Sequence, residues 1–110
     1  MISGKNYKSG DIVLCNCQFL DSSDYKKRPA LIVYSSGNHF IMCPVTSNLN
    51  RPGVFVGVED GLPINSVIRT DYIFTILKNT VIKKYLSLNF KKKEDICNKL
   101  TFKIKQNLLN

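Results

Sequence analysis

Short apolar runs alternate with polar, turn-forming segments over most of the chain. The clearest run, Ala30-Leu31-Ile32-Val33, is rich in β-branched residues and indicates a buried strand. We place Pro29 at the first position of this strand, because proline has no N–H group for a sheet. The same reasoning predicts strands over residues 12–17, 30–34, 40–45, 54–58, 66–69, 72–77 and 80–86, the sixth opening with a single helical turn.

The C-terminal segment has a different period. Ile96, Leu100, Ile104 and Leu108 recur every four residues and would share one helical face, which predicts a helix over residues 90–108. No repeat or linker interrupts the chain. We therefore predict one mainly β domain over 1–110, with a loose N-terminal arm at 1–9, a small, strongly bent β-barrel at 10–87, and the amphipathic helix.

Composition narrows the possible partners. The 110 residues suffice for one core, and no apolar run reaches the roughly 20 residues that span a bilayer. The N-terminus has no apolar segment of a signal peptide, so we expect a cytoplasmic protein without membrane contact. A net charge of +8 favours an acidic partner, although basic charge can also serve solubility alone. Much of this charge lies in a C-terminal lysine cluster that begins with Lys91-Lys92-Lys93.

The four cysteines give little sign of a metal site. Cys15 and Cys17 would share one face of a strand, but there is no C-x-x-C pair, and His39 is the only histidine. We expect no bound metal and reduced thiols that mostly pack as small hydrophobic groups.

Three polar groups stand at strand ends and could meet in a small barrel: Arg28, Thr46-Ser47-Asn48 and Arg69-Thr70-Asp71. Such a set suits a phosphodiester, where a base takes the 2′-OH proton and cations hold the charge on phosphorus. Asp71 could be the base, Arg28 and Arg69 could bind the phosphate, and Thr46 could donate to a non-bridging oxygen. Structural alternatives are an Arg69–Asp71 ion pair, an ordinary turn at Thr46, and solvated loop charges at 26–28.

Five short segments within residues 9–87 match the motifs of a known protein family in their order and spacing. They are Gly10-Asp11-Ile12-Val13-Leu14, Lys27-Arg28-Pro29-Ala30-Leu31-Ile32-Val33, Cys43-Pro44-Val45-Thr46-Ser47, Gly61-Leu62-Pro63 and Ser66-Val67-Ile68-Arg69-Thr70-Asp71. The chain thereby resembles the MazF/PemK (Kid-like) family of type II toxin–antitoxin endoribonucleases.

The resemblance implies an SH3-like barrel and a homodimer that cleaves single-stranded mRNA at short sequences, without metal or other cofactor. Attack by the 2′-OH would leave 2′,3′-cyclic phosphate and 5′-OH ends. The implied partners are RNA and an antitoxin with an acidic, extended C-terminal segment, together with which the toxin would bind DNA. The implied catalytic residues are Arg28, Thr46, Arg69 and Asp71, and the expected further RNA contacts are Lys26, Lys27, Ser47, Asn48 and Phe19.

Two other functions fit the same fold. One is a non-catalytic module that binds nucleic acid or protein, and the other is a CcdB-like gyrase poison, which needs no such Arg/Thr/Asp set. The loop 19–25 lacks the glycine-rich character common in the family, so the RNA sequence that is cut does not follow from the resemblance.

Overall fold

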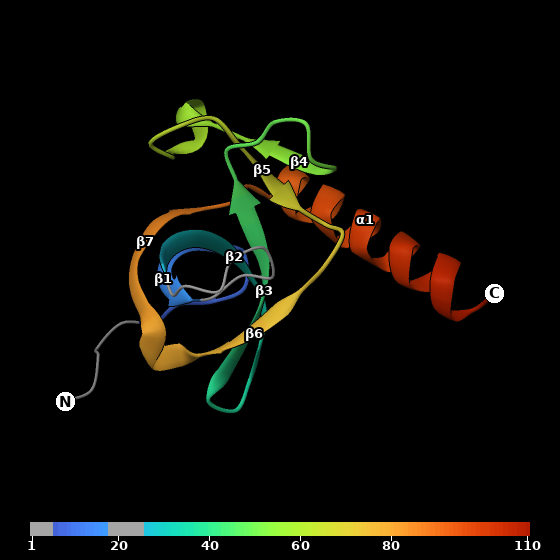
Figure 1. The fold of residues 1–110 in the computed structure, drawn as a ribbon, viewed down its shortest axis with the longest axis horizontal. Helices are drawn as coiled ribbons and strands as arrows, with labels where there is room; N and C mark the ends of the chain where they lie inside the picture. The colour runs from blue at the N-terminus through green and yellow to red at the C-terminus, as the bar shows by residue number, and fades with distance from the viewer. Residues whose placement is uncertain (1–5, 18–25) are drawn as a thin grey trace.

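The fold is an antiparallel sheet followed by one long helix, seen in a computed structural model that describes residues 6–17 and 26–110 (Figure 1). Its elements are β1 (Asp11–Cys17), β2 (Lys26–Ser36), β3 (His39–Thr46), β4 (Gly53–Val56), the 3₁₀ turn η1 (Val58–Asp60), β5 (Ser66–Arg69), β6 (Phe74–Leu77), the 3₁₀ turn η2 (Lys78–Thr80), β7 (Val81–Ser87) and α1 (Phe90–Leu108). The strands pair in the order β4-β5-β3-β2-β1-β7, and β6 also pairs with β3. The predicted mainly β fold with a C-terminal helix is confirmed.

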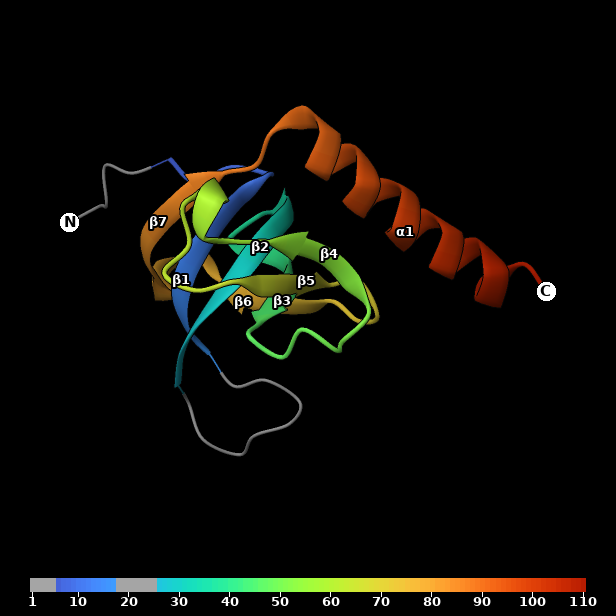
Figure 2. The ribbon, with the colours of Figure 1, turned by 90° about the horizontal axis from the view of Figure 1, so that it is seen from above.

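Strand β3 is the centre of the sheet. One of its edges pairs with β2, while the other pairs with β6 up to Met42 and with β5 from Val45 onward. Pro44 lies between these two partners, so a residue without an N–H group is tolerated there. The sheet is strongly bent, and Figure 2 shows β1, β2 and β7 curving together. Within the described residues, the pairing leaves β4 and β7 at its two ends rather than joining them.

Two details of the predicted elements are wrong. Strand β2 begins at Lys26, so Arg28 and Pro29 lie inside the strand and not at its start. Pro29 pairs with Leu14 of β1, but pairing with β3 begins only at Ala30, so β2 is an edge strand on that side at Pro29. The single helical turn expected at the start of 72–77 is not formed, and the chain there leads directly into β6.

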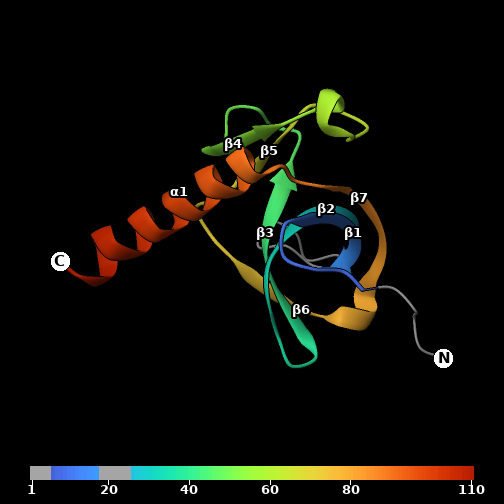
Figure 3. The ribbon, with the colours of Figure 1, turned by 180° about the vertical axis from the view of Figure 1, so that it is seen from behind.

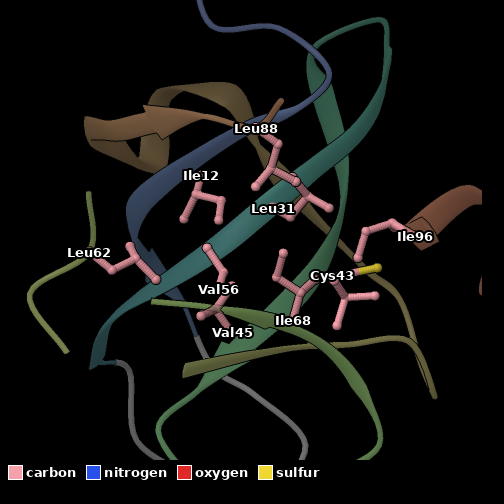
Figure 4. Packing of buried hydrophobic residues seen from close by; sticks show 10 residues of the cluster. Ile12, Leu31, Cys43, Val45, Val56, Leu62, Ile68, Leu88 and Ile96 are labelled. Atoms are coloured by element: carbon pink, nitrogen blue, oxygen red, sulfur yellow. The ribbon is translucent and has the colours of Figure 1, made fainter. Parts of the chain in front are cut away.

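Alternate residues of the central strands face two different apolar clusters, which explains why these strands are continuous apolar runs. One cluster contains Val13, Ile32 and Met42, and Tyr7 packs against it. The other contains Ile12, Leu31, Cys43 and Ile68, and Ile96 of α1 joins it (Figure 4). The helix is therefore anchored to the sheet through its first half.

The start of α1 is fixed by polar contacts. The Asn89 side chain caps the helix by accepting from the Lys92 backbone N–H at 2.9 Å. The Lys92 ammonium donates to Asp60 of η1 at 2.8 Å and to the Phe55 carbonyl at 2.9 Å. Beyond Leu100 the helix is exposed, and its C-terminal end projects away from the sheet (Figure 3). None of the helices in the described ranges has the length and apolar character required to cross a membrane.

Candidate functional site

Two adjoining cavities open where β2, β3 and β5 come together. Their shared wall consists of Arg28, Val45 and Thr46. The smaller cavity, of about 170 Å³, is also lined by Asn48, Arg51 and Arg69, so three arginine residues line it. The larger cavity, of about 310 Å³, extends from the same wall to apolar residues of the η1–β5 segment and to Tyr85. The smaller cavity is thus suited to an anion.

The sheet brings these residues together from distant parts of the chain. Arg28 lies in β2 opposite Cys15 of β1, Thr46 ends β3, and Arg69 ends β5. Pairing of β3 with β5 places Thr46 opposite Val67, and pairing of β4 with β5 places Gly53 opposite Arg69. Pairing of Ala30 with Pro44 brings Arg28 of β2 beside the end of β3. The site therefore depends on the registers of β2–β3, β3–β5 and β4–β5.

Arg69 and Asp71 form a two-point ion pair. Arg69 donates from Nε to Asp71 Oδ1 at 2.9 Å and from Nη2 to Oδ2 at 2.6 Å. The guanidinium also lies 4.6 Å from the centre of the Tyr72 ring. Hydrogen bonding to Arg69, together with the charges of Arg69 and Arg51, lowers the pKa of the Asp71 carboxyl group below its ordinary value, against a smaller opposing effect of burial. The Arg69–Asp71 ion pair, which the sequence analysis gave as the structural alternative, is therefore formed, and it positions Arg69 at the cavity.

The segment after β3 folds through two side-chain turns. Thr46 Oγ1 accepts from the Asn48 backbone N–H at 3.1 Å, and Asn48 Oδ1 accepts from that of Asn50 at 3.1 Å. A further bond from the Arg51 N–H to the Asn48 carbonyl, at 3.2 Å, turns the chain back toward the site. Because the Thr46 oxygen is used as an acceptor, its hydroxyl proton can be donated toward the cavity.

The predicted residues separate into three groups. Arg28, Thr46, Arg69 and Asn48 line the smaller cavity, and Asp71 contacts it through Arg69. Ser47 lines only the larger cavity, and Lys26 and Lys27 are exposed on β2 and line neither. Phe19 lies outside the described residues.

Arg51 was missed by the sequence prediction. It lines the smaller cavity, and its charge contributes to the lowered pKa of Asp71. A signal was present, since Arg51 precedes Pro52 as Arg28 precedes Pro29. The place of Arg51 in the fold could not be predicted from this polar loop, because it depends on the turns that follow β3.

The two thiols of β1 lie beside the site. Cys15 and Cys17 are buried on one strand face, as expected, with their sulfur atoms 3.5 Å apart. The single Cys15 thiol proton can be donated either to Cys17 or to the Arg28 carbonyl oxygen, which lies 3.4 Å from Cys15 Sγ. The hydrogen bond from Cys15, assisted by the charge of Arg28, lowers the pKa of Cys17. No group of three or more His, Cys, Asp or Glu side chains in the described part of the chain is placed to hold a metal ion.

Comparison with known proteins gives this geometry a family. The family model for the PemK-like, MazF-like toxin of type II toxin-antitoxin systems matches residues 8–103. The chain belongs to this PemK/MazF family. The match extends over the two cavities and most of α1, and it confirms the resemblance carried by the five short segments.

Solved structures agree with the PemK/MazF fold. The toxin MazF-mt6 of Mycobacterium tuberculosis is 20% identical with a TM-score of 0.69, over 84% of this chain and 93% of that chain. A MazE–MazF complex from Deinococcus radiodurans is 18% identical with a TM-score of 0.69, over 89% of this chain and 94% of that chain. A mycobacterial endoribonuclease in complex with its cognate antitoxin is 18% identical with a TM-score of 0.67, over 88% of this chain and 93% of that chain. At these identities the likeness establishes the fold. A comparison with curated proteins gives no match.

Proposed function

We propose that this PemK/MazF-family chain is a metal-independent, sequence-specific endoribonuclease that cleaves single-stranded mRNA. The observation that carries the proposal is the cavity in which Arg28, Arg51 and Arg69 surround one space beside the Thr46 hydroxyl. Three arginine residues and a hydroxyl residue match the charge and the acceptor oxygens of a phosphodiester. The net charge of +8 further favours association with RNA.

In the proposed reaction the 2′-oxygen attacks phosphorus and the bond from phosphorus to the 5′-oxygen breaks. The 2′-OH proton passes to water, and the departing 5′-oxygen takes a proton from water, which leaves 2′,3′-cyclic phosphate and 5′-OH ends. Arg28 and Arg51 bind the non-bridging oxygens, and Thr46 donates a hydrogen bond to one of them. Arg69 stabilises the charge that develops toward the leaving oxygen.

Asp71 acts in this proposal mainly by orienting Arg69. A general base works best when its pKa lies near the working pH, whereas the ion pair lowers the pKa of Asp71. The base role predicted for Asp71 is therefore weakened by the same two hydrogen bonds that position Arg69.

The activity is tested by incubating the purified protein with a long unstructured RNA in excess EDTA. We expect discrete fragments whose 3′ ends resist phosphatase until the cyclic phosphate is opened by acid. The doubly substituted Arg28→Ala/Arg69→Ala protein, purified in parallel, excludes a contaminating nuclease. A folded protein that leaves several RNAs intact would contradict the proposal and favour a binding module, or a gyrase poison if DNA supercoiling is inhibited instead.

Asp71→Asn separates orientation from base catalysis. Because asparagine can still accept one hydrogen bond from Arg69, we expect about a tenfold loss of kcat/KM if Asp71 orients, with an unchanged pH profile. A loss of 10³-fold or more would instead identify Asp71 as the base.

The same variant has a predicted effect on stability. Because the folded-state pKa of Asp71 is lowered, its contribution to stability is complete above the ordinary carboxyl pKa of about 4 and is lost as pH falls through the lowered value. Urea unfolding should therefore separate wild type from Asp71→Asn at pH 7, with a smaller difference at pH 2.5.

The proposed assembly is a cytoplasmic homodimer inhibited by an antitoxin, as the family resemblance implies. An apolar groove of about 400 Å³ between β2 and α1, lined by Tyr34, Ile73 and Leu100 among others, supports burial of a partner surface. The exposed Phe102 and Leu108 on the projecting half of α1 support the same proposal. Joint binding of DNA by toxin and antitoxin belongs to this proposal.

A further inference from the structure

The larger cavity differs in character from the smaller one that it adjoins. Beyond the shared wall of Arg28, Val45 and Thr46, it is lined by Leu62, Pro63 and Ile64 of the η1–β5 segment and by Tyr85 of β7. We infer that this cavity binds the nucleobase of a nucleotide next to the scissile phosphate and thereby contributes to the choice of cleavage site. The inference rests on the proposed ribonuclease function and extends it to a specificity subsite.

The position of the cavity supports a base rather than another group. A nucleotide presents a flat, largely apolar ring a few ångströms from an anionic phosphate. The two cavities offer the same arrangement, because Arg28 and Thr46 line both of them. A volume of about 310 Å³ is at the lower end of the range for small-molecule sites.

The apolar side of the cavity provides surfaces for stacking. Tyr85 supplies an aromatic ring, and Ile64 is 56% exposed although it is a large apolar residue. Bases stack on aromatic and apolar side chains in single-stranded nucleic acid complexes. The hydroxyl group of Ser47, which also lines the cavity and is exposed, is available for the edge of a base.

The segment that carries these residues is held rigidly. The Leu62 N–H donates to the Gly57 carbonyl at 3.2 Å, and Asn65 Oδ1 accepts from the Val58 N–H at 2.9 Å. The Ser66 hydroxyl, which is buried, donates to the Ile64 carbonyl at 3.0 Å. The Asp60–Lys92 ion pair ties η1 to the first turns of α1. A rigid surface loses little entropy when a base binds, which favours discrimination between bases.

The first experiment compares Ile64→Ala with Val58→Ala. Both residues are exposed apolar side chains of the same segment, but only Ile64 lines the cavity. Cleavage of an RNA with randomised positions is followed by sequencing of the new ends. We expect Ile64→Ala to reduce base preference at one position beside the cut, with about a tenfold loss of kcat/KM for the preferred base, while Val58→Ala retains the wild-type preference. An unchanged preference in Ile64→Ala, with cleavage retained, would overturn the inference and leave the ribonuclease proposal intact.

The second experiment detects base binding without cleavage. The chain contains no tryptophan, so Tyr85→Trp places a single tryptophan, which can be excited selectively, in the cavity. Titration with an oligonucleotide that carries 2′-deoxyribose at the cleaved position should quench this fluorescence. In the control variant Phe90→Trp, at an exposed position of α1 that lines neither cavity, the fluorescence should change little. The same oligonucleotide with an abasic residue at the position identified by sequencing should quench much less. Equal quenching by both oligonucleotides would contradict base binding, whether or not the protein cleaves RNA.

Discussion

Arg28→Ala is expected to lower kcat/KM for RNA cleavage about 10³-fold, equivalent to about 4 kcal/mol of transition-state stabilisation. Arg28 lines both cavities, so its loss removes a cation from the phosphate site and part of the wall beside the base site. The rate is measured with a fluorescent RNA that contains one cleavage site, under conditions where substrate is far below KM.

Arg28→Lys is the matched control for this prediction. Lysine keeps the positive charge but lacks the planar fork that binds two phosphate oxygens at once, so we expect an intermediate loss of about 10- to 100-fold. Circular dichroism of both variants should show the wild-type fold. If folded Arg28→Ala retained more than a tenth of the wild-type rate, Arg28 would not belong to the catalytic site.

Gly53→Ala is expected to destabilise the protein by about 3 kcal/mol or more. Gly53 has a φ of +153°, and a Cβ atom there would overlap the carbonyl oxygen of Ile68. The overlap would force β4 away from β5 at the residue that pairs with Arg69, so cleavage should fall together with stability. Both effects are measured on one preparation, by urea unfolding and by the single-site RNA assay.

Gly37→Ala provides the comparison for the backbone effect. Gly37 has a φ of +56°, but an added Cβ there has no heavy atom within 4 Å outside its neighbours in the chain. It should therefore cost only about 1 kcal/mol, from the left-handed conformation alone, and leave cleavage unchanged. Equal loss of stability in the two variants would show that the contact with Ile68 is unimportant.

Much of the fold could be predicted from local patterns because both faces of the central strands are buried. Continuous apolar runs identified β1, β2 and β3, and the four-residue repeat identified α1. The start of β2 could not be predicted, because a proline inside a strand is acceptable only where one edge is unpaired. That condition holds at Pro29, because pairing of β2 with β3 begins only at Ala30, and such long-range pairing is not visible in the local sequence.

Part of the candidate site could also be predicted, because several of its residues lie at strand ends. Arg28, Thr46 and Arg69 lie at or near strand ends that the sheet brings together, and the resemblance identified them. For Arg51 the only local signal was the proline that follows it, and Tyr85 had no local signal. Their places depend on a loop and on the pairing of β7 with β1. The sequence also could not reveal that Asp71 is bound by Arg69 through both oxygens.

The pairing of the first strand with the last strand of the sheet has a consequence for synthesis on the ribosome. Asp11 pairs with Ser87, and the smaller cavity needs Arg28, Arg51 and Arg69 from separate strands and loops. A growing chain cannot assemble this site until most of its length has left the exit tunnel, because domains fold as units. For the ribonuclease that we propose, we therefore expect no cleavage of its own message by the growing chain until most of the codons have been read.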